Sequence, residues 1–230
     1  MEQTIYIVAL VLTGLANLGM GAYLFSGSNA YRQQTVYYRS RMLTVLWQVV
    51  FGLGYFIQAT FLWRYTWPTA ASALLASFFH IGAICFNWGY IPLLNPKYLT
   101  KGIIVRDLII YAIGLTAYWT VALSWQHAPM YVALAFLIFF AYSTYTVFIF
   151  YRTYNRVSLR IIHMGAGNMR DFIRWMQVCC DCIVLFGIGS VAITAIFPND
   201  IIPFVLLLIG GVGMFAYMTY SIIKYGKIIS

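Results

Sequence analysis

The chain has 230 residues, of which 63% are hydrophobic, 19% aromatic and only 8% charged, with a mean hydropathy of +0.82. Soluble globular proteins are about 45–50% apolar and about 25% charged, so this composition excludes a water-soluble fold. The net charge of +9 comes from basic residues between apolar stretches, where they suit anionic lipid headgroups better than nucleic acid. We therefore expect an integral membrane protein that binds no nucleic acid through this chain.

Seven stretches are apolar and long enough to cross the roughly 30 Å hydrocarbon core of a bilayer as helices. In chain order they are residues 4–25, 42–63, 69–94, 107–125, 130–151, 176–197 and 202–224. Short joints that contain proline alternate with longer, charged joints, as expected for helices that run up and down through the bilayer. The sequence thus predicts an all-α membrane protein with a single domain, a bundle of seven transmembrane helices.

Lysine and arginine are distributed unequally between the two ends of the predicted helices. With spans that alternate in direction, all 14 of these residues except Arg64 fall on one side. An excess of positive residues marks the cytoplasmic side, which predicts the N-terminus outside and the C-terminus in the cytoplasm. No Lys or Arg precedes the first apolar stretch, so it reads as a span rather than a signal peptide. We expect the protein in a bacterial inner (plasma) membrane.

Asp181 is the only carboxylate well inside a predicted span, where an ionisable group costs at least about 2.5–3.5 kcal/mol at the bilayer centre. Arg174 and Gln177 share its helix face, at spacings of three, four and seven. At about 1.5 Å per residue, polar residues of five other spans reach the same depth, about 9–12 Å from the inner boundary. These are Asn17, Gln48, Asn87, Tyr145 and Tyr217, and Tyr142, Ser143, Thr144 and Thr146 lie close by. They predict either a polar binding layer around Asp181 or contacts that hold the helices together.

Two further groups within the spans are candidates for a functional role. His80 lies near the middle of the third span and is either a proton-sensitive group or a hydrogen-bonded core histidine. Cys179 and Cys182 have the C-x-x-C spacing, but two positions on one helix supply only two ligands. Because no second Cys or His pair lies at a matching depth, we expect no metal site.

Two features bear on association with other molecules. Arg152, Arg156 and Arg160 recur at every fourth residue, as do Arg170 and Arg174. The fifth helix is therefore expected to continue beyond the bilayer as a basic stripe and to break at residues 165–167, after which the chain re-enters through a second short stripe. The stripe fits either anionic headgroups on the cytoplasmic side, at about 1 kcal/mol per basic residue, or a cytoplasmic output partner. Small residues at 14–22, 187–190 and 210–213 favour either close packing within the bundle or a homodimer.

The motifs of common enzymes and cofactor proteins are missing from the sequence. The seventh span has no lysine near its middle that could hold retinal as a Schiff base. The chain also lacks a Walker sequence, Gly-x-Ser-x-Gly and the metalloprotease His-Glu motif. We therefore expect no enzymatic activity and no cofactor.

The stretches TAASALLASFFHIGAICFNWGYIPLLNPKYLTKGIIVRDLIIY and RDFIRWMQVCCDCIVLFGIGSVAITAIFP resemble the N-terminal membrane region of Bacteroidota helix-turn-helix regulators. The resemblance covers most of the chain as an overall pattern. It implies a membrane-tethered sensor whose helices precede a cytoplasmic DNA-binding domain. The segment YGKIIS after Lys224 is too short for a helix-turn-helix, so direct DNA binding does not carry over.

Three functional hypotheses follow from these patterns. The first is a sensor or signal-transducing module, the membrane portion of a longer regulator, that passes a shift of its fifth to seventh helices inward. The second is a small-solute or proton-coupled transporter that uses the polar layer as its binding site. The third is a structural subunit of a membrane assembly.

Overall fold

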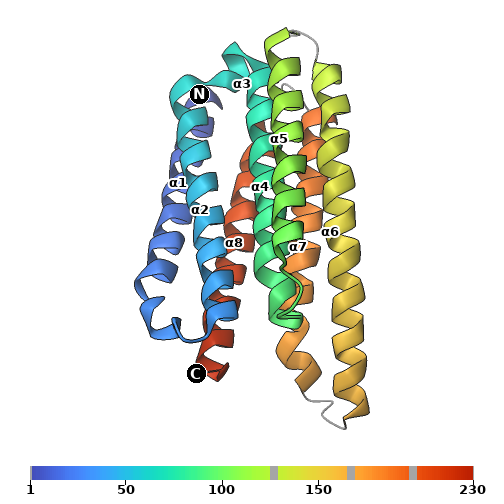
Figure 1. The fold of residues 1–230 in the computed structure, drawn as a ribbon. Coiled ribbons are helices and arrows are strands. Elements are labelled where there is room, and N and C mark those ends of the chain that lie inside the picture. Colours follow the sequence, from blue (N-terminus) through green and yellow to red (C-terminus); the bar gives the residue numbers. More distant parts are fainter. Residues whose placement is uncertain (1, 125–128, 165–168, 197–200, 230) are drawn as a thin grey trace.

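A computed structural model describes residues 2–124, 129–164, 169–196 and 201–229, and within these ranges it contains helices and no strands. The long helices are α1 (Glu2–Ser26), α2 (Thr35–Phe61), α4 (Pro68–Leu94), α5 (Lys101–Ser124), α6 (Pro129–His163), α7 (Met169–Ile196) and α8 (Ile201–Ile229). A 3-10 turn, η1 (Asn29–Tyr31), follows α1, and a short helix, α3 (Trp63–Thr66), follows α2. Among the described residues, seven helices are long and apolar enough to cross a membrane, which confirms the prediction of an all-helical chain with seven potential membrane-spanning helices (Figure 1).

Several helices extend beyond the spans predicted from hydrophobicity. Helix α2 begins at Thr35 rather than Met42, and α6 continues past Tyr151 to His163. Helix α5 begins at Lys101, where the Thr100 hydroxyl accepts a hydrogen bond from the Ile103 amide at 3.4 Å. Hydrophobicity marks only the part of a helix that lies in lipid, whereas backbone hydrogen bonding continues until a cap or turn ends it.

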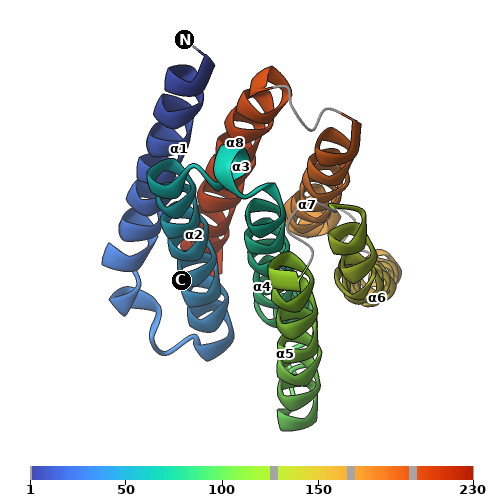
Figure 2. The ribbon, with the colours of Figure 1, turned by 90° about the horizontal axis from the view of Figure 1, so that it is seen from above.

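Helix α4 lies at the centre of the bundle. It contacts α2, α5 and α6, while α1 pairs with α2 and α8, and α7 lies between α6 and α8 (Figure 2). In its most apolar 18-residue window, 72% of the residues are buried, against 17% in α5. A helix that is apolar on all sides is expected to be buried on all sides, and α4 carries no charged residue.

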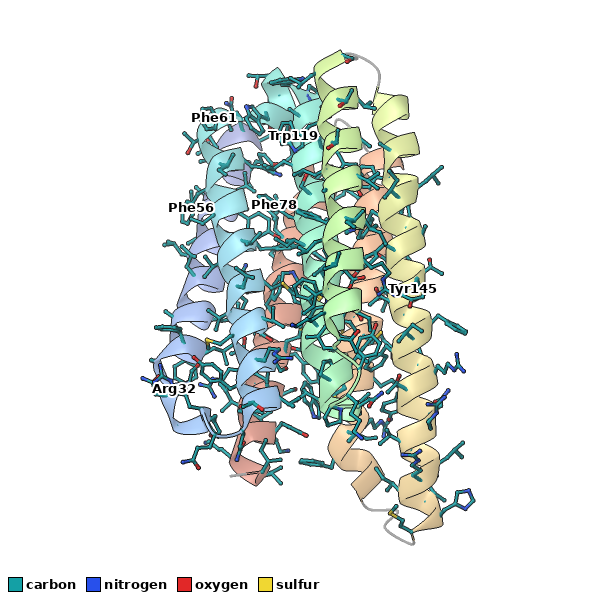
Figure 3. The ribbon with its side chains drawn as sticks, viewed as in Figure 1. Arg32, Phe56, Phe61, Phe78, Trp119 and Tyr145 are labelled. Atoms are coloured by element: carbon teal, nitrogen blue, oxygen red, sulfur yellow. The ribbon has the colours of Figure 1, made fainter. Side chains whose placement is uncertain are left out.

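Close contacts between helices use glycine on one side and a large side chain on the other. Phe78 of α4 packs on Gly54 of α2, where a Cβ atom would lie 2.0 Å from the ring, and Figure 3 shows Phe78 between these two helices. Helices α1 and α2 meet at Gly14, whose Cβ would lie 3.2 Å from the carbonyl oxygen of Gly52. The small residues at the start of the 14–22 run therefore serve packing within the chain.

The first turn of α1 and the last turn of α8 lie at opposite ends of the bundle, as an odd number of spanning helices requires (Figure 1). The end at which α8 finishes also holds the turn between α1 and α2 and the extension of α6 (Figure 1). We call it the basic end, because Arg32 and the three arginines Arg152, Arg156 and Arg160 lie there or on that extension.

Candidate functional site

The most buried carboxylate of the described bundle is Asp107 of α5, which is 0% exposed. Its Oδ2 accepts hydrogen bonds from Asn87 Nδ2 at 2.9 Å and from Trp88 Nε1 at 2.8 Å, both on α4. Its Oδ1 accepts two from Arg106, from Nη2 at 2.7 Å and from Nε at 2.9 Å. Each carboxylate oxygen thus has two donors, which is the arrangement that makes a buried charge tolerable.

The same hydrogen bonds continue to α6 and to the turn before α5. Asn87 Nδ2 also donates to the Tyr142 hydroxyl at 3.1 Å, and its Oδ1 accepts from the Tyr98 hydroxyl at 2.8 Å. Arg106 Nη1 donates to the Tyr145 hydroxyl at 2.8 Å. Burial raises the pKa of Tyr98, so its hydroxyl remains a donor at neutral pH. The members of this Asp107 cluster are Asn87, Trp88, Tyr98, Arg106, Asp107, Tyr142 and Tyr145.

Sequence reasoning found two members of the cluster, Asn87 and Tyr145, but not its centre. The predicted span began at Asp107, which placed that residue at the membrane boundary. The helix in fact begins at Lys101, so Asp107 lies in its second turn and faces α4. The Arg-Asp pair beside an apolar run was the available signal, because adjacent opposite charges reduce the cost of burial.

His80 lies fully buried above this cluster. Its Nδ1 is 3.1 Å from the Tyr118 hydroxyl, and its ring lies between those of Tyr142 and Tyr111, with centroid distances of 5.0 and 5.3 Å. Nε2 has no hydrogen-bond partner among the described residues. This environment matches the hydrogen-bonded core histidine of the two interpretations more closely than an exposed proton-sensitive group.

Asp181 lies in a different part of the bundle. It is half-buried on α7 and accepts a hydrogen bond from the Tyr151 hydroxyl of α6. On the same helix Gln177 is half-buried and Arg174 is exposed. The hydrogen bond of Asp181 therefore connects α6 with α7 and does not involve the Asp107 cluster.

The remaining polar residues at the predicted depth form separate pairs. Gln48 Nε2 of α2 donates to the Thr219 hydroxyl of α8 at 2.6 Å. Asn17 Nδ2 donates to the Thr13 carbonyl of its own helix at 2.9 Å, and Tyr217 is 36% exposed. The expected single layer around Asp181 is thus divided into local groups, because residue counting gives the depth of a side chain but not the direction in which it points.

A buried arginine of α2 binds the C-terminal end of α1. Arg41 of α2 is 4% exposed, and its Nε donates to the Leu24 carbonyl at 2.8 Å and to the Ser28 hydroxyl at 3.1 Å. The hydroxyl of Tyr37 donates to the Ile222 carbonyl of α8 at 2.8 Å. A cation at a helix C-terminus is stabilised by the helix dipole, so this group joins α1, α2 and α8.

The arginines of the basic stripe are exposed. Arg152, Arg156 and Arg160 lie on the described extension of α6, and Arg174 lies on the first turns of α7. The side chain of Arg170 and the predicted break at 165–167 lie outside the described residues. The stripe is therefore accessible to headgroups or to a protein partner.

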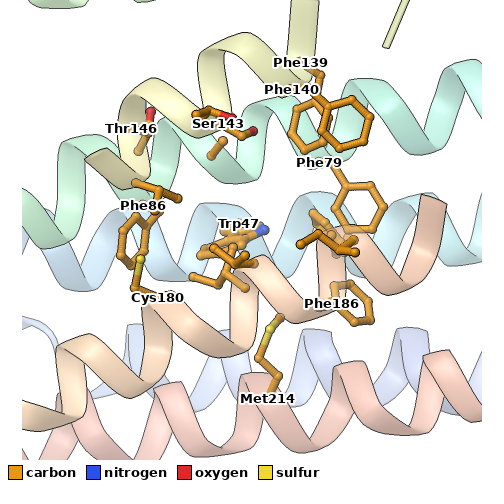
Figure 4. Close-up of a pocket in the computed structure, with 18 residues that line it drawn as sticks. Trp47, Phe79, Phe86, Phe139, Phe140, Ser143, Thr146, Cys180, Phe186 and Met214 are labelled. Atoms are coloured by element: carbon orange, nitrogen blue, oxygen red, sulfur yellow. The ribbon is translucent and has the colours of Figure 1, made fainter. Parts of the chain in front are cut away.

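An apolar cavity of about 240 Å³ lies between α4, α6 and α7, with α2 and α8 behind it (Figure 4). Seven aromatic side chains line it, and they come from four different helices: Trp47, Phe51, Phe79, Phe86, Phe139, Phe140 and Phe186. The backbone at Gly187 borders open space, since a Cβ atom there would have no neighbour within 4 Å. None of the described residues that line the cavity is charged.

Three polar atoms of the residues that line the cavity lack a partner. Ser143 Oγ and Thr146 Oγ1 of α6 and Trp47 Nε1 of α2 are buried and make no hydrogen bond to any described residue. Thr146 adds a second hydroxyl to the α6 wall (Figure 4). A buried polar group without a partner costs about 1–3 kcal/mol, so this wall gains from an occupant that can form hydrogen bonds.

The cavity reaches the outer surface of the bundle between α6 and α7. Its lining includes Thr144, which is exposed, and Ile188, which is 57% exposed. Both residues lie within the stretches of α6 and α7 that are apolar and long enough to cross a membrane, so lipid would surround them in a bilayer. A lipophilic molecule therefore has a direct path from the bilayer to the cavity.

Sequence reasoning noted the hydroxyl-rich run Tyr142–Thr146 but missed the cavity and Trp47. The available signal was the coincidence of that run with a glycine at a similar depth on α7. Within the described residues no three His, Cys, Asp or Glu side chains gather as metal ligands. A scan of protein-family models, a search of curated proteins and a search of solved structures each found no match.

Proposed function

We propose that this protein is an integral membrane receptor module that binds a lipophilic molecule in the cavity between α4, α6 and α7. The observation that carries the proposal is the cavity wall, which is apolar, open toward the outer surface between α6 and α7, and formed by residues with three unpartnered polar atoms. Pockets of this composition, with few polar groups among aromatic side chains, are characteristic of sites for small ligands.

The proposed output is a change in the relative position of α6 and α7. Both helices line the cavity, and both carry exposed arginines toward the basic end. A ligand shifts a conformational equilibrium only by binding one state better than the other, and a cavity between two helices allows that difference. With the N-terminus outside and the C-terminus in the cytoplasm of a bacterial inner membrane, this change would reach a cytoplasmic partner at the basic end.

The distribution of polar groups favours a receptor over a transporter for polar solutes. The charged residues Asp107 and Arg106 bond to each other and to neighbouring side chains, and they do not line the cavity. A solute carrier needs polar groups that converge on a central site near the bilayer midplane. The resemblance to membrane-tethered regulators points in the same direction, and a role as structural subunit draws on no feature of the cavity.

The proposal is tested by filling the cavity. Gly187→Leu places a side chain in the open space, whereas Gly189→Leu makes the same change two positions along α7, where the nearest atom to an added Cβ is 3.9 Å away. The wild type and both variants are purified from the same membranes, and the molecules extracted from them are compared by mass spectrometry. We expect a lipophilic compound with wild type and Gly189→Leu and its loss from Gly187→Leu; identical extracts from all three would refute the proposal.

Transmission is measured separately with spin labels on the basic end. Labels at Arg160→Cys and Arg174→Cys, in a Cys182→Ala background because the other cysteines are buried, report the distance between α6 and α7. We expect the distance distribution of the wild-type cavity to differ from that of Gly187→Leu. Equal distance distributions would mean that the protein binds a molecule but does not change the relative position of α6 and α7.

A further inference from the structure

The cavity places three constraints on its occupant, which concern charge, shape and hydrogen bonding. Its described lining includes no charged side chain, although charged residues are present elsewhere in the bundle. Asp107 is neutralised by Arg106 at 2.7 Å, and Asp181 accepts from Tyr151. An ionised ligand would find no partner here and would lose its hydration, so the occupant is neutral.

The wall favours a flat ring. Phe79 meets Phe186 edge to face at a centroid distance of 5.4 Å and lies nearly parallel to Phe139 at 6.2 Å, so both kinds of aromatic contact are already formed around the space. An engineered cavity of about 150 Å³ in another protein holds benzene. A cavity of about 240 Å³ has room for one substituted ring or two fused rings.

The unpartnered donor groups of the wall require a hydrogen-bond acceptor on the occupant. An indole N–H donates and cannot accept, so Trp47 is satisfied only by an acceptor atom. The Ser143 hydroxyl can donate to the same kind of atom. An added Cβ on Gly82 would lie 2.5 Å from Trp47 Nε1, so the indole packs closely on the α4 backbone beside the cavity.

The opening between α6 and α7 indicates where the rest of the molecule lies. Thr144 and Ile188 line the cavity and are exposed at the lipid-facing surface, so a chain attached to the ring can leave the bundle there. We propose that the cavity binds a neutral lipid with a flat ring head that carries carbonyl oxygens, the chemistry of a quinone, with its hydrocarbon tail in the bilayer between α6 and α7. This inference rests on the proposed receptor function and specifies its ligand class.

The test compares three amphiphiles of similar chain length in lipid nanodiscs that contain the wild-type protein. The probes are a decyl-substituted 1,4-benzoquinone, dodecanol and dodecanoate, and the readout is the ligand-induced rise in melting temperature together with the apparent Kd. We expect the benzoquinone to bind at least about tenfold more tightly than dodecanol, with no saturable binding of dodecanoate. Ser143→Ala and Trp47→Phe should each weaken benzoquinone binding by about fivefold to tenfold, the factor expected for one hydrogen bond.

The outcomes separate the ligand class from the receptor function. If dodecanol binds as tightly as the benzoquinone, or if neither Ser143→Ala nor Trp47→Phe changes the benzoquinone Kd, the ring-carbonyl assignment is overturned while a lipophile receptor stands. Tighter binding of dodecanoate overturns the assignment of a neutral ligand. If no probe binds and the purified protein yields no cavity-dependent compound, both proposals fail. Gly189→Leu, which should keep the wild-type Kd, controls for a general effect of substitutions on α7.

Discussion

The Asp107 cluster and the cavity wall use the same helices, α4 and α6, but differ in how their polar atoms are satisfied. Asp107 accepts four hydrogen bonds, and Asn87 uses both of its polar atoms. Ser143 Oγ and Trp47 Nε1 have no partner among the described residues. A satisfied buried network holds helices in register, whereas capacity to bind a ligand remains where the network is incomplete. The Asp107 cluster therefore stabilises the packing of the helices, and the uncharged cavity wall is the candidate binding site.

The largest expected effect comes from removing the carboxylate at the centre of the Asp107 cluster. Asp107→Ala leaves the Trp88 indole without its acceptor, takes one of two acceptors from Asn87 Nδ2 and leaves Arg106 without its ion pair, so it should lower the free energy of unfolding by about 3 kcal/mol. Denaturant titration in detergent measures this change. Asp107→Asn keeps one acceptor oxygen and should lose less. A stable Asp107→Ala protein that has lost its bound molecule would move the binding site to the cluster and reverse the comparison.

A steric change near His80 tests how tightly the helices around it are packed, without altering any charge. A Cβ atom at Gly114 would lie 2.9 Å from both His80 Nδ1 and the Tyr118 hydroxyl, so Gly114→Ala should cost about 2 kcal/mol through overpacking. Gly102→Ala on the same helix meets only Thr100 Oγ1 at 3.9 Å and should be neutral or stabilising by up to about 1 kcal/mol. Equal stability of the two variants in the same titration would show that the packing around His80 is adaptable.

Asp181 should be less important for stability than Asp107. Asp181→Asn keeps an oxygen that can accept from Tyr151, so the free energy of unfolding should fall by about 0.6 kcal/mol, the average for a polar contact between membrane helices. Tyr151→Phe removes this hydrogen bond altogether and should lower the free energy of unfolding by at least as much. Mass spectrometry of the extract should find the bound molecule in both variants. Its loss from Asp181→Asn alone would make this carboxylate part of the binding site.

The smallest expected effect on stability is that of Ser143→Ala. The hydroxyl has no partner to lose, so in the absence of ligand the free energy of unfolding should stay within about 0.5 kcal/mol of wild type. Ser77→Ala is the matched control, because Ser77 Oγ is buried and donates to the Ala73 carbonyl at 2.8 Å; it should cost about 0.5–1 kcal/mol. A larger loss from Ser143→Ala than from Ser77→Ala would mean that Ser143 is already satisfied and would weaken the case for the cavity.

The helices themselves could be predicted well because their signals are local. Each of the seven apolar stretches corresponds to a helix, and the spacing of Arg152, Arg156 and Arg160 anticipated the extension of α6 to His163. The ends were less accurate where a polar helical turn lies outside the apolar window, as at Lys101. That small error had a large consequence, because it placed Asp107 at the end of a helix rather than in its interior. The prediction therefore missed a buried carboxylate that accepts four hydrogen bonds.

The sequence by itself determined that this chain forms helices which, in the described residues, include seven long and apolar enough to cross a membrane, since length and hydropathy act along each helix independently of its neighbours. It also determined the position of each polar residue along its own helix, which follows from a constant rise per residue. Only the tertiary structure decided which of these residues meet, because the direction of a side chain depends on how each helix is rotated against the others. The same packing created the cavity, whose rings come from helices far apart in the chain and whose open space at Gly187 no single stretch of sequence specifies.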